Sequence, residues 1–137
     1  MRAYELQRAA AAALATARVL DAQGDSLRSD LVVGGDARAA ARADSLASRV
    51  RRVAAEFNRL YSVCGALVRA METFSSAPTT DQRAQLAWAG EDLDNAVRGI
   101  NELIRTEIPA LYAEFARGKQ PRTPPLLPTP PAPRARP

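Results

Sequence analysis

The chain has 137 residues, of which 47% are hydrophobic, 25% charged and 5% aromatic, a size and composition typical of one globular domain. It has no histidine and one cysteine, Cys64, which excludes histidine-dependent catalysis, internal disulfides and Cys/His metal clusters. The net charge of +4 comes from Lys119, Arg122, Arg134 and Arg136 near the C-terminus, so the preceding body is neutral. We therefore expect no nucleic-acid partner. The sequence has no run of 18 apolar residues, so we predict no membrane span.

The first segment predicts a helix over about residues 2–28 with few large apolar side chains. Its apolar positions follow the 4-3 spacing of a heptad: Leu6, Ala10, Ala13, Ala17, Leu20 and Leu27, with Gly24 also in this seam. Alanine favours helix but buries little area, so this helix should stabilise a bundle less than its partners do. Residues 29–35 are predicted to form a connection in which Leu31 and two valines plug one end. Because the first helix is about ten residues shorter than the others, we expect the natural chain to continue upstream of Met1.

The middle segment predicts one long helix over residues 37–74. Its 4-3 seam is apolar at every position: Ala39, Ala43, Leu46, Val50, Val53, Phe57, Leu60, Cys64, Leu67, Met71 and Phe74. This pattern is typical of a long helix packed at a shallow angle against partner helices. Gly65 is the weak point, because glycine costs about 1 kcal/mol relative to alanine in a helix.

The third segment predicts a helix over residues 80–117. Thr79 and Gln82 have the spacing of a capping box, and Gly118 is a typical helix terminator. Its apolar positions are Leu86, Leu93, Val97, Ile100, Ile104, Leu111 and Phe115. Pro109 lacks an N–H and clashes with the carbonyl of Arg105, which predicts a kink near Pro109.

The composition of residues 119–137 predicts a basic, disordered tail. Eight prolines between Pro121 and Pro137 exclude helix and sheet and favour polyproline II. Arg122, Pro125 and Pro128 fit the R-x-x-P-x-x-P pattern of ligands for aromatic-grooved SH3 modules, which suggests a weak polyproline contact. We predict an all-α, antiparallel three-helix bundle of coiled-coil type over residues 1–118, followed by this tail.

Two features of the sequence, an acidic patch and the cysteine, have the residue types of a chemical site. Glu91, Asp92 and Asp94 form an acidic patch, but a bundle without insertions offers no concave site facing it, so we expect a solvent-exposed face with Asp94 paired to Arg98. Cys64 lies in the apolar seam, which predicts a buried, inert thiol. We therefore predict no catalytic, cofactor-binding or metal-binding residue, no cofactor and no enzyme activity.

The order of features over residues 4–115 resembles a known family. The segments that carry the resemblance are Ala77-Pro78-Thr79-Thr80-Asp81-Gln82, Ile100-Asn101-Glu102-Leu103 and Ile108-Pro109-Ala110-Leu111, with Leu86 and Leu93 between the first two. They are similar to the C-terminal helical region of large bacterial β-propeller proteins, the sortilin-like or BNR-repeat glycosyl hydrolases. The resemblance implies a helical end piece and an extracytoplasmic location. It transfers no catalytic residue, because this chain has no propeller blade or Asp-box repeat.

The predicted function is a non-catalytic helical packing or interaction module, the C-terminal piece of a larger β-propeller protein. Its partner would be a protein: a helical domain, a propeller or a second copy. Two alternatives stay open. The chain could be a fragment of a glycosyl hydrolase-like enzyme whose catalytic part is absent here, or a self-associating coiled coil, since the alanine-rich first helix covers the leucine-rich seams thinly.

Overall fold

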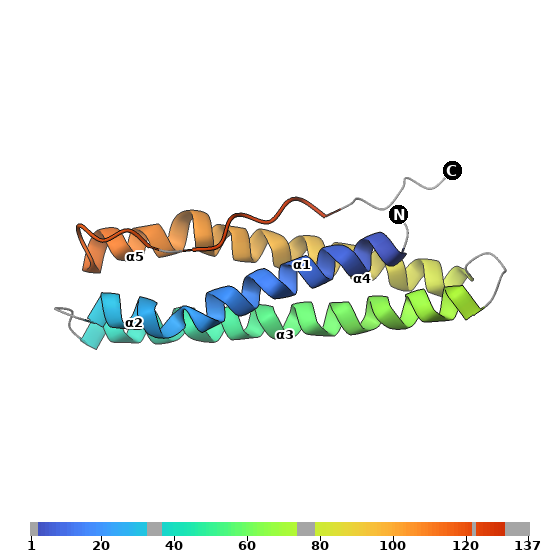
Figure 1. The fold of residues 1–137 in the computed structure, drawn as a ribbon, viewed down its shortest axis with the longest axis horizontal. Coiled ribbons are helices and arrows are strands. Elements are labelled where there is room, and N and C mark those ends of the chain that lie inside the picture. Colours follow the sequence, from blue (N-terminus) through green and yellow to red (C-terminus); the bar gives the residue numbers. More distant parts are fainter. Residues whose placement is uncertain (1–2, 33–36, 74–78, 122, 131–137) are drawn as a thin grey trace.

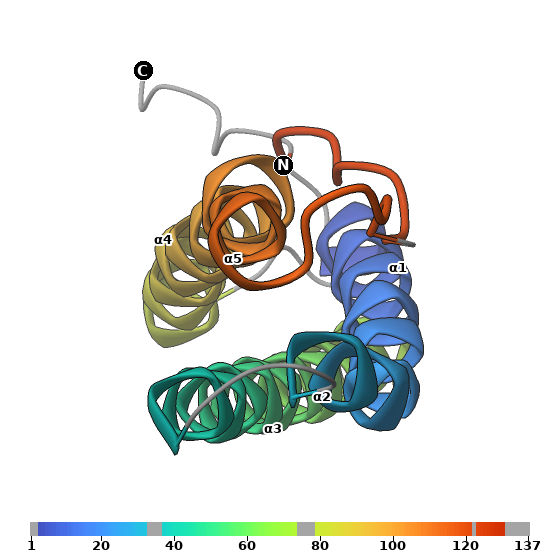
Figure 2. The same ribbon diagram turned by 90° about the vertical axis from the view of Figure 1, so that its left-hand side faces the viewer.

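In the computed structural model, residues 3–32, 37–73, 79–121 and 123–130 are described; they form three antiparallel helical rods and an extended tail (Figure 1). The elements are α1 (Ala3–Ala22), α2 (Gly24–Val32), α3 (Ala37–Thr73), α4 (Thr80–Glu102), a π-helical turn η1 (Leu103–Glu107) and α5 (Ile108–Phe115). Together, α1 and α2 make the first rod, α3 the second, and α4, η1 and α5 the third. Seen along the bundle, the rods lie at the corners of a triangle (Figure 2). The predicted all-α, three-rod architecture is confirmed.

The uninterrupted helix α3 is the rod against which the other two pack. Its 37 residues span about 55 Å. The described seam positions face the core: Ala39, Ala43, Leu46, Val50, Phe57, Leu60, Cys64 and Leu67 are buried, and Val53 and Met71 are half-buried. Phe74 lies outside the described residues. Gly65 does not break the rod, and Phe57 is fully buried, so the apolar seam outweighs the low helix propensity of one glycine.

The first rod differs from its prediction at both the middle and the end. Gln23 forms a turn between α1 and α2, and α2 continues to Val32, so residues 29–32 are helical and not the predicted connection. The reason is that Leu27 and Leu31 continue the 4-3 seam, and both are buried. Leu31 thus fills its end of the core as expected, while Val33 lies outside the described residues. Gly24 occupies the remaining seam position.

The third rod begins as predicted. The Thr79 hydroxyl accepts from the Gln82 N–H at 3.1 Å, and the Gln82 carboxamide accepts from the Thr79 N–H at 3.0 Å. At the C-terminal end, α5 stops at Phe115, two residues before the predicted limit. Gly118 then adopts φ +88°, a left-handed conformation that suits glycine and turns the chain away from the helix axis.

The irregularity expected at Pro109 takes the form of the π-helical turn η1. The buried positions Ile100, Ile104, Ile108 and Leu111 are separated by four, four and three residues, one residue more than a heptad allows. A π turn absorbs this extra residue and keeps the apolar side chains on one face; the Ile108 N–H donates to the Leu103 carbonyl. Pro109 consequently falls in the first turn of α5, where its missing N–H is tolerated.

The described part of the Pro-rich tail has neither helix nor strand, as predicted, and runs back along the third rod (Figures 1 and 2). Residues spaced by three turn toward the bundle: Pro121, Pro124 and Leu127 are half-buried, and Pro130 is buried. This period is that of polyproline II. Residues 123–130 therefore follow a defined course against the bundle. The remainder of the predicted disordered tail, residues 122 and 131–137, lies outside the described residues.

Candidate functional site

The acidic residues considered from the sequence form ion pairs on the surface. Asp92 pairs with Arg59 of α3 at 3.0 Å, and Asp94 pairs with Arg98 at 2.8 Å, as expected. The part of the chain that the structure describes contains no cluster of three Asp, Glu, Cys or His side chains that could hold a metal ion. Within this patch, Asp92 links α4 to α3, whereas the Asp94 pair lies within α4.

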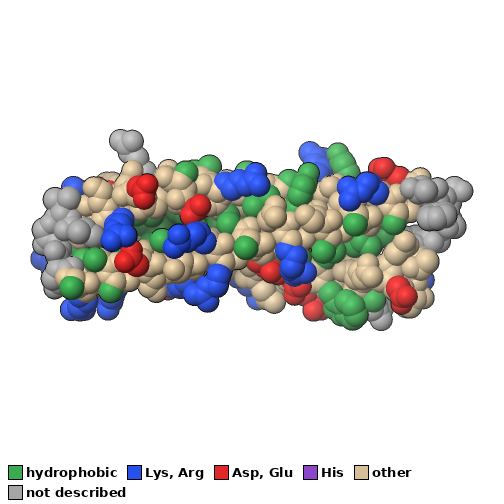
Figure 3. Space-filling model, turned by 90° about the horizontal axis from the view of Figure 1, so that it is seen from below, with side chains coloured by type: hydrophobic (Ala, Val, Ile, Leu, Met, Phe, Trp, Pro, Cys, Tyr) green, Lys and Arg blue, Asp and Glu red, His purple; other side chains and the backbone are tan. Residues whose placement is uncertain are grey.

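Arginine–carboxylate pairs link α3 to both neighbouring rods. Arg49 donates to Glu107 at 2.7 Å and Arg38 to Glu114 at 2.7 Å, while Arg28 of α2 reaches Asp44 at 2.8 Å. These pairs are largely exposed, so each contributes at most about 1 kcal/mol. On the face shown in Figure 3, basic and acidic side chains alternate and hydrophobic side chains lie between them. No broad surface of one charge covers that face.

The single thiol is buried in the core, as predicted. Burial raises the pKa of Cys64 to about 11. The thiol is therefore protonated at neutral pH, and a protonated, buried thiol is a poor nucleophile.

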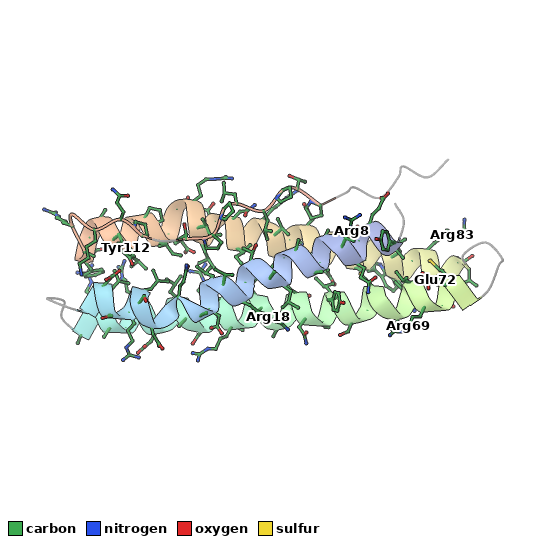
Figure 4. The ribbon with its side chains drawn as sticks, in the orientation of Figure 1. Arg8, Arg18, Arg69, Glu72, Arg83 and Tyr112 are labelled. Carbon is green, nitrogen blue, oxygen red and sulfur yellow. The ribbon has the colours of Figure 1, made fainter. Side chains whose placement is uncertain are left out.

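A cleft of about 520 Å³ lies where α2, α5 and the start of the tail meet. Its lining residues are Gln23, Ser26, Leu27, Asp30, Tyr112, Lys119 and Gln120. The Tyr112 hydroxyl donates to Asp30 Oδ2 at 2.7 Å, and Lys119 Nζ donates to Asp30 Oδ1 at 3.4 Å. Tyr112 lies between the ribbons of α5 and α2 (Figure 4). One carboxylate thus joins α2 to both α5 and the tail.

The chemistry of this cleft favours a structural role over a reaction centre. We call Tyr112, Asp30 and Lys119 the clamp. Burial, and then the hydrogen bond to Asp30, raise the pKa of Tyr112, so its phenol stays a protonated donor at neutral pH. Asp30 in turn accepts from Tyr112 and Lys119. These residues could not be predicted from the sequence, because a contact between positions 30 and 112 leaves no periodic signal.

At the distal end, where α3 ends and α4 begins, a shallow apolar groove of about 590 Å³ opens between the two helices. It is lined by Val63, Ala66, Leu67, Ala70, Gln82 and Gln85. Trp88, one helical turn beyond Gln85, is 64% exposed. We call Trp88 and these six residues the distal surface. Both helices extend past the start of α1 here (Figure 1), and Gly65, which faces Gln7 of α1, lies on the other side of α3.

One feature of the sequence indicates the distal surface: the position of Trp88 in its helix. Trp88 lies off the seam that passes through Leu86 and Leu93, so the largest side chain in the chain points away from the core. Glu72 and Arg83 project at this end of the bundle (Figure 4), while the Arg69 guanidinium lies by Gly65 on the α1 side of α3. An apolar centre with a charged rim is the usual composition of a protein interface.

A second contact site holds the tail. The Asn101 carboxamide donates to the Leu127 carbonyl at 2.9 Å and accepts from the Leu127 N–H at 2.8 Å. Leu127 also packs against the hydrophobic core. Of the residues predicted to contact an SH3-type module, Pro125 and Pro128 are exposed, and Arg122 lies outside the described residues. We call Asn101 and the surface under Leu127 the tail-docking site.

Comparisons of the chain with protein-family models, curated proteins and solved structures find no match. The resemblance to the C-terminal region of sortilin-like β-propeller proteins therefore stays a prediction. Among the described helices, none has the length and apolar content needed to cross a membrane.

Proposed function

We propose that the chain is a non-catalytic helical packing and interaction module that engages another helix or domain through the distal surface. The exposure of Trp88, one helical turn from Gln85 of the apolar groove, carries this proposal. Tryptophan is enriched among the residues that dominate interface energetics. A groove between two helices is a common receptor for the apolar face of a third helix. This groove lies on the side of α3 away from Gly65 and α1, and its lining comes from α3 and α4 alone.

The state of the titratable groups supports the non-catalytic part of the proposal. The clamp phenol and the core thiol are both held in their protonated forms at neutral pH, and the clamp carboxylate is engaged by two donors. General base or nucleophilic catalysis needs the opposite, a group poised to accept a proton or attack. Turnover of a glycoside by the purified chain, abolished by Glu91→Gln or Asp94→Asn, would contradict this part and favour the hydrolase-fragment alternative.

The interaction itself is tested by site-specific photo-crosslinking. A benzophenone amino acid replaces Trp88 in one variant and Tyr61 in the other; Tyr61 is an exposed aromatic residue of α3 outside the groove. Each variant is irradiated alone and in an extract of the source cells. We expect a discrete adduct only from position 88, and its loss when Ala66→Glu places a charge in the groove. Ala41→Glu, at an equally exposed position of α3, should leave the adduct intact.

The mass of the adduct separates the partners. Twice the chain mass, formed without extract, identifies self-association, and sedimentation equilibrium should then show a mass that rises with concentration. A larger adduct formed only in extract identifies a different protein. Equal crosslinking from positions 88 and 61 would contradict the proposal. Attachment to a β-propeller is a separate prediction, and an in-frame propeller-coding sequence upstream of the Met1 codon would support it.

A further inference from the structure

The contact between Asn101 and Leu127 has the geometry of peptide recognition. A carboxamide has one donor side and one acceptor side, and here both are used by the N–H and C=O of a single residue. These two groups point the same way in an extended chain, so Asn101 pairs with Leu127 much as a neighbouring β-strand would. Such pairing recognises backbone and requires only that the bound residue be extended and not proline.

Within residues 123–130, three non-proline residues precede a proline, and Leu127 is the apolar one. Leu127 precedes Pro128, and a residue before proline is restricted to extended backbone. Leu127 also has the N–H that prolines lack. Its side chain packs against the core, whereas the side chain of Leu126 is 44% exposed. Leu127 thus contributes an apolar side chain and a backbone unit to the contact, and the proline that follows it fixes its conformation.

The tail is held weakly enough to exchange. Two hydrogen bonds and the burial of Pro124, Leu127 and Pro130 hold it, and hydrogen bonds between neutral groups contribute little net free energy because water competes for the same groups. Its upstream end is tethered at Lys119, which pairs with Asp30. Tethering gives the tail an effective concentration on the order of millimolar, so it occupies its site in cis without strong contacts. A segment of the same kind supplied in trans has to compete with it.

We propose that the tail-docking site is a binding site for an extended peptide with an apolar residue before proline, and that residues 123–130 occupy it as an intramolecular, autoinhibitory ligand. Docking also holds the Pro125 and Pro128 region against the bundle, so displacement of the tail frees this segment. The inference concerns the third rod and the tail. It stands independently of the distal surface, and either can fail without the other.

The first test follows the Leu127 amide in the full chain by hydrogen exchange. We expect measurable protection of this amide in the wild-type chain and its loss in Asn101→Ala. Asn95→Ala is the matched control, because Asn95 is an exposed asparagine of the same helix. Helical circular dichroism should be the same in all three chains. Equal exchange of Leu127 in wild type and Asn101→Ala would overturn the proposal.

The second test measures binding in trans with a fluorescein-labelled peptide of residues 119–131, followed by fluorescence anisotropy. In the Leu127→Asp chain the resident tail is weakened, so the peptide should bind at least about ten-fold more tightly than to wild type. Leu126→Asp, at the exposed neighbour, should bind it as wild type does. Adding Asn101→Ala to the Leu127→Asp chain should remove binding. Failure of the peptide to bind the Leu127→Asp chain, or binding that ignores Asn101, would overturn the proposal.

Discussion

Replacing Tyr112 by phenylalanine tests the clamp between α2 and α5. The substitution keeps the buried ring and removes only the hydroxyl that donates to Asp30 at 2.7 Å. A hydrogen bond to a charged group contributes about 1.5–3 kcal/mol, and the lower end applies because this bond is only partly buried. The remaining pair of Asp30 with Lys119, at 3.4 Å, is exposed and compensates little. We expect a loss of about 1.5 kcal/mol and a fall in Tm of about 4–6 °C.

Urea unfolding at pH 7, followed by circular dichroism, measures this loss. Tyr61→Phe is the matched control, because Tyr61 is exposed on α3, and it should change the unfolding free energy by less than about 0.5 kcal/mol. A double-mutant cycle with Asp30→Ala should return most of the loss as coupling between the two side chains. If Tyr112→Phe costs no more than Tyr61→Phe, or if the coupling is near zero, the clamp does not stabilise the bundle.

The pH dependence of the same pair has a definite sign. The pKa of Tyr112 is raised above its usual value of 10, so the clamp contributes fully below pH 10 and its contribution is lost only as pH rises through the raised pKa. The gap in unfolding free energy between wild type and Tyr112→Phe should therefore be constant from pH 7 to pH 9 and narrow from about pH 10 upward. A gap that already closes between pH 8 and pH 9 would contradict this assignment.

Three further changes test the rods and the core. Gly24→Ala should stabilise the chain by about 0.5–1 kcal/mol in urea unfolding, because an added Cβ meets no atom within 4 Å. Gly99→Ala, where an added Cβ is equally free of contacts, is the control for helix propensity and should stabilise the chain by the same amount. Destabilisation at Gly24 alone would show that the turn before α2 requires glycine. Deleting Thr106 from η1 should return Pro109 to a helix interior and destabilise the chain by about 3 kcal/mol. Adding Pro109→Ala to the deletion should recover most of that loss. If the deletion variant melts like wild type, the π turn does not serve to accommodate the proline. The raised pKa of Cys64 favours the folded state, so its contribution to stability should be lost as pH rises from about 9 to 11. The fall between pH 9 and pH 10, below the range in which Tyr112 titrates, should be absent in Cys64→Ala; parallel pH profiles for the two chains would contradict this.

The parts of the fold that follow from the sequence are those with periodic burial. An apolar side chain every three or four residues must lie on one face of a helix, so the seam of α3 and the existence of three rods could be predicted. The capping box was equally accessible, because Thr79 and Gln82 interact over three residues. Even η1 leaves a trace, the extra residue in the spacing between Ile104 and Ile108, although its form as a π turn required coordinates.

The contacts that suggest function have no such pattern. Asp30 meets Tyr112 across 82 positions of sequence, and Asn101 meets Leu127 across 26. Each depends on how the rods are aligned and where the chain turns back at Gly118, which no local rule supplies. The length of the first rod was underestimated for a related reason: the helix was predicted to end near residue 28, with residues 29–35 as a connection. Burial of Leu27 and Leu31 against α3 extends the helix to Val32.

The return of the tail along the third rod has a mechanical consequence. Because the chain reverses after α5, its outgoing end travels back toward the pole where α1 begins (Figure 1). Tension applied to the two ends of the chain would therefore load the tail before it loads the rods. It would peel Pro130 and then Leu127 from the bundle one residue at a time, the loading direction in which small contacts yield at the lowest force.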